Sequence, residues 1–180
     1  ALRRCRGHVL DAGAGAGSLS LALQSQQINV TALDIFSGSV QIMKERGVKQ
    51  AICADIFRYH GQQFDTLLLM MNGIGLAGTT GGLHRLLKHF HKLLAPGGQI
   101  IFDSSDISYI TEEGVTPTGR YVGEIRYQYE YRGKKGQWFH WLYIDAARME
   151  AAANACGWQM QMVMEDDTDA WLGVLTSKRR

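Results

Sequence analysis

Apolar runs and amphipathic stretches alternate along the first half of the chain. The apolar runs predict strands over residues 8–11, 29–34, 50–55, 64–71 and 99–103. The stretches between them predict helices over residues 19–24, 39–46 and 83–94, with Ser18 as the first helix N-cap. Because the fourth run is continuously apolar, it suits a parallel strand that is covered on both faces. Strands that alternate with helices predict an α/β fold with a parallel sheet and right-handed crossovers.

The pattern changes after the fifth predicted strand. Residues 121–131 alternate and are rich in Tyr, and residues 138–144 form a second β-like run. Residues 133–136, with Gly at both ends, predict a hairpin turn between these two runs. The rest of the pattern predicts a helix over 145–155 and strands over 158–163 and 171–175. A hairpin is therefore expected to interrupt the α/β pattern.

Length, charge and cysteine content narrow the class of protein. The 180 residues suit one domain over residues 1–180. The net charge of +2 argues against a strong general affinity for nucleic acid. Cys5, Cys53 and Cys156 lie far apart, so they indicate neither a disulfide framework nor a CxxC metal site. No apolar stretch is long enough to span a membrane and no signal peptide is visible, so we expect a cytoplasmic protein.

Three glycines, Gly13, Gly15 and Gly17, form a G-x-G-x-G turn between the first predicted strand and the helix after it. Side chains at these positions would keep a ligand away from the backbone. The helix N-terminus beyond the turn offers unpaired N–H groups and a partial positive charge. The pattern indicates a nucleotide-binding turn, and the alternative is a tight turn of small residues without a ligand.

Acidic residues end the second and third predicted strands. Asp34 lies about 20 residues past the first glycine, where ribose-binding carboxylates sit in nucleotide-binding α/β folds. Asp55 ends the third strand and could accept a hydrogen bond from an adenine amino group. The alternatives are that Asp34 caps the following turn and that Asp55 is a solvated loop acid. Polar groups at successive strand ends predict one crevice at one edge of the sheet.

These residues together resemble class I S-adenosylmethionine (SAM)-dependent methyltransferases. Residues 9–17 are similar to the first motif of that family, residues 94–98 to the approach to its fifth strand, and residues 155–158 to the start of its C-terminal strands. The resemblance implies a three-layer α/β/α sandwich with a mostly parallel seven-stranded sheet. The implied strand order is 3-2-1-4-5-7-6, with strand seven antiparallel.

The resemblance also implies an activity, a cofactor and its site. The chain would transfer a methyl group from SAM and release S-adenosyl-L-homocysteine. The glycine turn would hold the amino-acid part of SAM, Asp34 the ribose and Asp55 the adenine. The implied cofactor-binding residues are Asp11, Gly13, Ala14, Gly15, Gly17, Asp34, Ile35, Asp55, Ile56, Met71 and Asn72. An upstream helix often covers the cofactor in that family, and this chain begins at Ala1 just before the first predicted strand, so we expect that a natural N-terminal segment is missing.

Two other functions stay open: an NAD-linked oxidoreductase on a related fold, and a non-catalytic SAM-fold module that binds a partner. Ser18 stands where a G-x-G-x-x-G dehydrogenase turn has its last glycine, which favours SAM over NAD. After the fourth strand, Met71 and Asn72 precede Gly73, without the Pro-Pro-aromatic sequence of amino-methylating DNA enzymes. The Pro-Cys pair of cytosine-C5 enzymes is also absent from the sequence. We therefore expect a small-molecule acceptor.

Aromatic residues gather in the inserted segment, residues 104–144, which is expected to form the acceptor side. The candidate acceptor-binding residues are Tyr109, Tyr127, Trp138 and Trp141. An aromatic wall would suit a flat acceptor, or a cationic one through cation–π contacts. The alternative, which the alternation favours, is that the hairpin packs its aromatic face on the core.

Histidines offer few candidates for catalysis. His140 is a candidate general base, and the alternative is a half-exposed strand histidine. His84, His89 and His91 are expected on the outer side of an amphipathic helix. No trio of His or acidic residues has metal-ligand spacing, so no metal is expected.

Overall fold

The computed structural model describes residues 1–110 and 120–178. Seven strands form one sheet in the order β3-β2-β1-β4-β5-β9-β8. The strands are β1 (His8–Ala12), β2 (Asn29–Asp34), β3 (Ala51–Cys53), β4 (Phe64–Leu69), β5 (Leu94–Ser105), β8 (Trp158–Glu165) and β9 (Ala170–Ser177). The first five strands run parallel, whereas β9 is antiparallel to both of its neighbours. When only the strands of this sheet are numbered, β8 is the sixth strand and β9 the seventh. The expected order 3-2-1-4-5-7-6, with strand seven antiparallel, is therefore confirmed.

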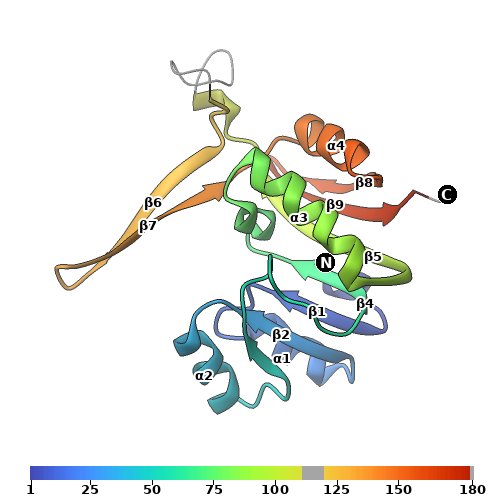
Figure 1. Ribbon diagram of the computed structural model, residues 1–180, viewed down its shortest axis with the longest axis vertical. Helices are drawn as coiled ribbons and strands as arrows, with labels where there is room; N and C mark the ends of the chain where they lie inside the picture. The colour runs from blue at the N-terminus through green and yellow to red at the C-terminus, as the bar shows by residue number, and fades with distance from the viewer. Residues whose placement is uncertain (111–119, 179–180) are drawn as a thin grey trace.

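Helices cover both faces of this sheet (Figure 1). The helices are α1 (Ser18–Ser25), α2 (Ser37–Glu45), α3 (Thr80–Leu93) and α4 (Ala146–Ala155), with 3-10 turns η1 (Leu2–Arg4), η2 (Gly73–Ala77) and η3 (Ser108–Ile110). On one face, Leu10 of β1 packs in a cluster with buried leucines of α3 and with Met149 of α4. On the other face, Val9 packs with Leu23 of α1. Neighbouring strand residues therefore serve opposite layers, as the pleat of a strand requires.

Several element ends differ from the sequence prediction. Helix α3 begins at Thr80 rather than at residue 83, because the Thr79 side chain accepts a hydrogen bond from the Gly82 N–H and caps the helix. The prediction that Ser18 caps α1 is wrong, since Gly17 occupies the cap position in a left-handed conformation without a side-chain hydrogen bond. Strand β5 begins at Leu94, since its ladder with β4 starts before an irregularity in register.

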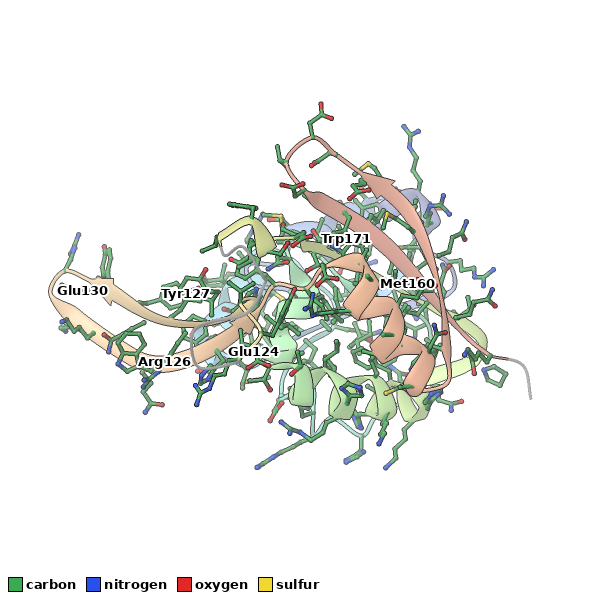
Figure 2. The ribbon with its side chains drawn as sticks, turned by 90° about the horizontal axis from the view of Figure 1, so that it is seen from above. Glu124, Arg126, Tyr127, Glu130, Met160 and Trp171 are labelled. Atoms are coloured by element: carbon green, nitrogen blue, oxygen red, sulfur yellow. The ribbon has the colours of Figure 1, made fainter. Side chains whose placement is uncertain are left out.

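Within the inserted segment, β6 (Glu124–Tyr131) and β7 (Lys134–Leu142) form a separate two-stranded hairpin. It projects away from the body of the molecule, as Figures 1 and 2 show. The turn is Arg132-Gly133, with φ of 49° and 74°, and not the predicted residues 133–136. Two successive positive φ values characterise the tight turns that match the twist of a hairpin. The structure instead places Lys134 within β7.

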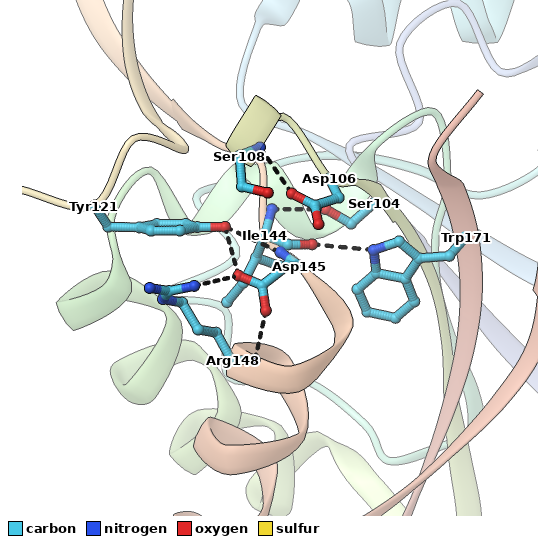
Figure 3. A network of polar contacts seen from close by, with 8 residues as sticks. All are labelled: Ser104, Asp106, Ser108, Tyr121, Ile144, Asp145, Arg148 and Trp171. Carbon is cyan, nitrogen blue, oxygen red and sulfur yellow. Dashed lines mark hydrogen bonds and ion pairs between the residues drawn. The ribbon is translucent and has the colours of Figure 1, made fainter. Parts of the chain in front are cut away.

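A buried polar network fastens the base of the hairpin to the sheet and to α4 (Figure 3). Tyr121 donates a hydrogen bond of 2.9 Å to Asp145, which is also the N-cap of α4. Arg148 donates to the same carboxylate at 2.9 Å and stacks its guanidinium on the Tyr121 ring. Burial raises the pKa of Asp145, but the hydrogen bonds from Arg148 and Tyr121 outweigh it and hold the pKa below its usual range. The hairpin is thus held by charge-assisted bonds at its base.

Two general properties follow from the described residues. No helix in residues 1–110 and 120–178 is both long and apolar enough to cross a membrane. Cys5, Cys53 and Cys156 are free thiols.

Candidate cofactor and acceptor site

The glycine turn joins β1 to α1 at the carboxyl edge of the sheet. Gly13, Gly15 and Gly17 all have positive φ, at 75°, 55° and 78°, a conformation that side chains disfavour. The N–H groups of Gly13 and Ala14 both donate to the carbonyl of Leu33, which ties the turn to the end of β2. A Cβ at Gly15 would meet no atom within 4 Å, so the turn opens onto free space there. The turn therefore offers an accessible backbone at the point where a ligand could approach.

Asp34, at the end of β2, lies directly beside this turn. Its side chain accepts hydrogen bonds from the Gly15 N–H at 2.8 Å and from the Phe36 N–H at 2.9 Å. The residue is 7 % exposed, while the following Ile35 is 58 % exposed. Asp34 does cap the following turn, as one alternative held. A carboxylate has about four acceptor sites, so both oxygens can also accept from ribose hydroxyls.

Asp11 is buried beneath the glycine turn. Its carboxylate is 2 % exposed and accepts a hydrogen bond of 2.6 Å from the Ser20 hydroxyl of α1. Burial raises the pKa of Asp11 to about 6, and the nearby charge of Asp34 adds to the rise. A buried carboxyl with a raised pKa costs stability at neutral pH, which is typical of functional rather than structural groups.

Asp55 lies two residues past the end of β3, at the same edge of the sheet. Its Oδ1 accepts from the Phe57 N–H at 2.9 Å, and Arg58 lies 3.9 Å from its other oxygen. Its side chain is 35 % exposed, so it remains open to a ligand. The side chain of Ile56, in contrast, is 6 % exposed and packs within the core.

Met71 and Asn72 follow β4 in a strained conformation, with φ of 66° and 57°. Asp103 of β5 holds this turn, since its carboxylate accepts from the Met71 N–H at 3.1 Å and the Gly73 N–H at 3.0 Å. Both polar atoms of the Asn72 carboxamide are buried without a hydrogen-bond partner. An unsatisfied buried amide costs about 1–3 kcal/mol, so the strain and the unpaired carboxamide together indicate a place for a ligand.

The sheet order explains why these residues meet. Strands β2, β1 and β4 are neighbours, so their carboxyl ends bring Asp34, the glycine turn and Asn72 to one edge. Sequence reasoning missed the roles of Ser20 and Asp103. Asp103 was visible as an acid at the end of the fifth predicted strand, which makes it a further strand-end carboxylate at this edge. The bond from Ser20 to Asp11 joins a helix to a strand, and no local pattern reveals it.

The aromatic residues of the hairpin divide between its two faces. Tyr127 and Phe139 are cross-strand partners with ring centroids 5.9 Å apart, and Trp141 lies on the same face, 6.5 Å from Phe139. Trp138 lies on the opposite face, where Arg126 stacks on its ring at 4.6 Å. The structure therefore brings Tyr127 and Trp141 together and separates Trp138 from them.

The aromatic face does not pack on the core over most of its length, so that alternative is wrong. Tyr129 and Tyr131 are 72 % and 71 % exposed. In the part of the chain that the structure describes, the base of the hairpin meets the body, where the Trp141 indole occupies the space that a side chain at Gly75 would need. Tyr109, in η3, is 75 % exposed and joins no ring contact among those described.

The 3-10 turn η2 connects the hairpin to the glycine turn. A Cβ at Gly13 would lie 3.0 Å from the Leu76 side chain, so Leu76 covers the start of the glycine turn. The neighbouring Gly75 lies under Trp141, so the aromatic face begins one residue from this cover. The candidate cofactor site and the aromatic face therefore adjoin through η2.

The structure narrows the choice of proton-transfer groups. His140 is exposed and pairs with Arg126, on the opposite face of β7 from Trp141. The hydroxyls of Tyr127 and Tyr143 share a hydrogen bond, and this bond and burial raise the pKa of Tyr143 to about 12. Across residues 1–110 and 120–178, no group of three or more His, Cys, Asp or Glu residues could hold a metal ion.

Comparison with known proteins identifies relatives of this architecture. The family model of a methyltransferase domain matches residues 9–98. A SAM-dependent methyltransferase from Bacteroides fragilis, solved in complex with S-adenosyl-L-homocysteine, is 36 % identical with a TM-score of 0.90. The match covers 99 % of this chain and 75 % of that one. No curated protein matches the chain.

More distant structures share the fold. A SAM-dependent methyltransferase from Clostridium acetobutylicum is 14 % identical with a TM-score of 0.69, and the match covers 99 % of this chain and 87 % of that one. A SAM-bound amino pentose methyltransferase from Micromonospora echinaspora is 16 % identical with a TM-score of 0.67, over 98 % of this chain and 86 % of that one. At these identities the likeness concerns the fold alone.

Proposed function

The chain belongs to the SAM-dependent methyltransferases, and from this premise we propose that it methylates a small molecule held between η2 and the base of the hairpin. Membership replaces the two other readings, an NAD-linked oxidoreductase and a non-catalytic module. SAM is the cofactor, and S-adenosyl-L-homocysteine is the product formed from it. The observation that carries the proposal is the position of Trp141, whose ring covers Gly75 in the turn that covers the glycine motif.

Each part of SAM would meet different residues at the carboxyl edge of the sheet. The open backbone at Gly15 would hold the amino-acid part, because a Cβ there would meet no atom within 4 Å and the space beside the turn is free. The Asp34 carboxylate would accept from the two ribose hydroxyls, and Asp55 would accept from the adenine amino group. Ile35, which is largely exposed, would lie against the adenine ring.

The other implied contacts lie at the ends of β1 and β4. Asp11 would support the glycine turn from beneath, since its bond to Ser20 joins β1 to α1. Asn72 would find the partners that its carboxamide lacks, and the exposed side chain of Met71 would lie over the ligand. Because the side chain of Ile56 is buried, Ile56 would contact SAM through its backbone.

Methyl transfer asks mainly for positioning. When bound, SAM supplies an electrophilic methyl group, so the protein must align an acceptor and exclude water. Trp141 and Leu76 form an apolar cover at the junction of the two sites. Tyr143, with its pKa raised to about 12, keeps its proton at neutral pH and serves as a hydrogen-bond donor rather than a base. His140 remains the candidate base only for an acceptor that reaches the opposite face of β7.

The acceptor is proposed to be flat or cationic. Tyr127, Phe139 and Trp141 present successive ring faces and edges on one side of the hairpin. Such a wall binds planar groups by stacking and cations by their attraction to the ring face. The net charge of +2 gives no general pull on nucleic acid, which favours a small molecule. The free thiols of Cys5, Cys53 and Cys156 suit work in the cytoplasm.

The acceptor site is tested with a panel of planar amines, phenols and carboxylic acids, with release of S-adenosyl-L-homocysteine as the readout. For any acceptor found, Trp141→Ala should raise its KM about tenfold, since an aromatic contact of this size is worth about 1 kcal/mol or more. The Kd of SAM should change less than about twofold. Trp138→Ala, on the opposite face, is the matched control and should leave KM unchanged. Equal effects of the two substitutions would refute the placement of the acceptor.

A further inference from the structure

Within residues 1–110 and 120–178, little covers the outer part of the hairpin. Among the described residues, β6 and β7 pair only with each other. A two-stranded hairpin is marginally stable by itself in water. Its outer end nevertheless exposes large aromatic rings, with Tyr129 at 72 % and Tyr131 at 71 %. Something is therefore expected to lie against it.

In this two-stranded sheet β6 and β7 each have one edge that no other described strand pairs with. Strand β7 packs against η2, so the edge of β6 is the less obstructed of the two. The unpaired backbone groups of such an edge form a template for a further strand. The base is firmly held, because Glu124 accepts bonds of 2.7 Å from both the N–H and the hydroxyl of Thr80 at the start of α3. The hairpin extends from this held base away from the body, as Figure 2 shows.

The sequence of β6 is complementary to itself when it runs antiparallel. The strand reads Glu-Ile-Arg-Tyr-Gln-Tyr-Glu-Tyr from Glu124 to Tyr131. If two copies pair around Gln128, Arg126 of one lies opposite Glu130 of the other, and the same contact forms again across the symmetry axis. Tyr127 then lies opposite Tyr129 of the second copy, again twice. Opposite charges and aromatic rings are the cross-strand pairs that stabilise antiparallel sheets.

Neighbouring registers lack this match. Two antiparallel copies related by a two-fold axis must centre on a residue, because directly opposed side chains lie on the same face of the sheet whereas neighbouring residues lie on opposite faces. Centring on Tyr127 would place Glu124 opposite Glu130, and centring on Tyr129 would place Arg126 opposite Arg132. Like charges directly opposite each other are destabilising. The charge pattern therefore selects Gln128 as the centre.

We propose that two copies of the chain pair through β6, antiparallel and centred on Gln128, to form a four-stranded sheet β7-β6-β6-β7. This proposal does not depend on the identity of the acceptor. Each subunit would extend the other's hairpin and give its aromatic rings new neighbours. Closed two-fold symmetry is the commonest arrangement of soluble oligomers, and it satisfies both β6 edges at once.

The present partners of the two charged residues leave this pairing open. Glu130 lies 4.0 Å from Lys135, and both side chains are more than half exposed. Arg126 stacks its guanidinium on Trp138, which leaves its N–H groups free to meet a carboxylate. An exposed ion pair of that length contributes little, so a second copy can take its place.

The test is a charge exchange, with molar mass measured by light scattering and sedimentation. The wild-type chain should be dimeric at about 100 µM. Arg126→Glu and Glu130→Arg should each raise the dimer Kd about tenfold or more, since each places two like-charge pairs across the axis. The double variant R126E/E130R restores opposite charges and should return the Kd to within about threefold of wild type. Lys134→Glu, a charge reversal on β7, is the control and should leave the Kd unchanged.

A cysteine tests the register. In a C53S background, which removes the exposed native thiol, Gln128→Cys places two thiols directly opposite each other. Mild oxidation should then give a covalent dimer, because directly opposed Cβ atoms lie near disulfide distance. Lys134→Cys in the same background should stay monomeric on a denaturing gel. A monomeric wild type would overturn the proposal, as would a dimer whose Kd ignores the charge exchange.

Discussion

Two buried carboxylates, Asp11 beneath the glycine turn and Asp145 at the base of the hairpin, have pKa values that are shifted in opposite directions. Burial raises the pKa of Asp11 to about 6, and hydrogen bonds from the hydroxyl and the backbone N–H of Ser20 oppose the rise. Burial acts on Asp145 too, but Arg148 and Tyr121 surround it with donors and hold its pKa below the usual range. One region carries an unfavourable charge and the other a satisfied one.

The opposite pKa shifts distinguish a region suited to binding a ligand, around Asp11, from a region that stabilises the fold, around Asp145. A buried charge that destabilises the fold is typical of a functional site, whereas a charge with several hydrogen-bond donors contributes to stability. The carboxyl edge also holds the unpaired Asn72 carboxamide and two strained residues. The hairpin base holds an N-cap, an ion pair and a cation–π contact. We therefore expect substitutions at the edge to change SAM binding, and those at the hairpin base to change stability.

The largest contrast is expected between two glycines of similar conformation. Gly15 and Gly133 have φ of 55° and 74°, and a Cβ at either would meet nothing within 4 Å. A valine is strained at both, but only at Gly15 does it fill space where SAM would lie. Gly15→Val should weaken SAM binding about 100-fold or more, and Gly133→Val less than about twofold, by isothermal titration. Similar losses in both variants would show that strain alone is responsible.

Asp11→Asn should stabilise the protein at neutral pH while it keeps an acceptor for Ser20. Because the pKa of Asp11 is raised above its unfolded value of 3.8, its stabilising contribution is full below that pH and is lost as pH rises to about 6. The variant should exceed wild type by about 2 kcal/mol at neutral pH and equal it at about pH 3.5, in urea unfolding. A constant difference across this range would contradict the buried charge.

Asp145→Asn should show the opposite pH dependence. The pKa of Asp145 is lowered, so its contribution is present above 3.8 and is lost as pH falls through the folded pKa. The variant, which can still cap α4, should lose about 1–2 kcal/mol at neutral pH and little in acid. The same urea experiment measures it, and a loss that persists in acid would place the effect in the cap rather than in the charge.

Tyr121→Phe is expected to have the smallest effect. It removes the hydroxyl that donates to Asp145 and accepts from the Asp145 N–H. The free energy of unfolding should fall by about 1 kcal/mol, and the Kd of SAM should stay unchanged. A change in SAM affinity would show that the hairpin base and the carboxyl edge of the sheet are coupled, and would contradict the expectation that the hairpin base affects stability alone.

The sequence predicted the cofactor edge better than the hairpin, and the reason is physical. Parallel strands place their carboxyl ends together, so a glycine turn, Asp34 and Asp55 could be assigned to one edge from order alone. Apolar and polar residues alternate in the hairpin as they do in a strand that packs on a core. Alternation therefore does not reveal whether the apolar face is packed against the rest of the protein. Contacts such as Tyr121 to Asp145 join elements that no local pattern relates. The turn at Arg132 was missed because a non-glycine residue adopts positive φ there.

The central claim is that the carboxyl edge binds SAM through Asp34, and isothermal titration of SAM into wild type and Asp34→Ala tests it most directly. Asp166→Ala is the control, because Asp166 is likewise a turn-capping acid but lies in an exposed loop. Loss of a charged hydrogen bond is worth about 1–3 kcal/mol, so the Kd for Asp34→Ala should rise about tenfold or more. The Kd for Asp166→Ala should equal that of wild type. An unchanged Kd for Asp34→Ala would contradict the account.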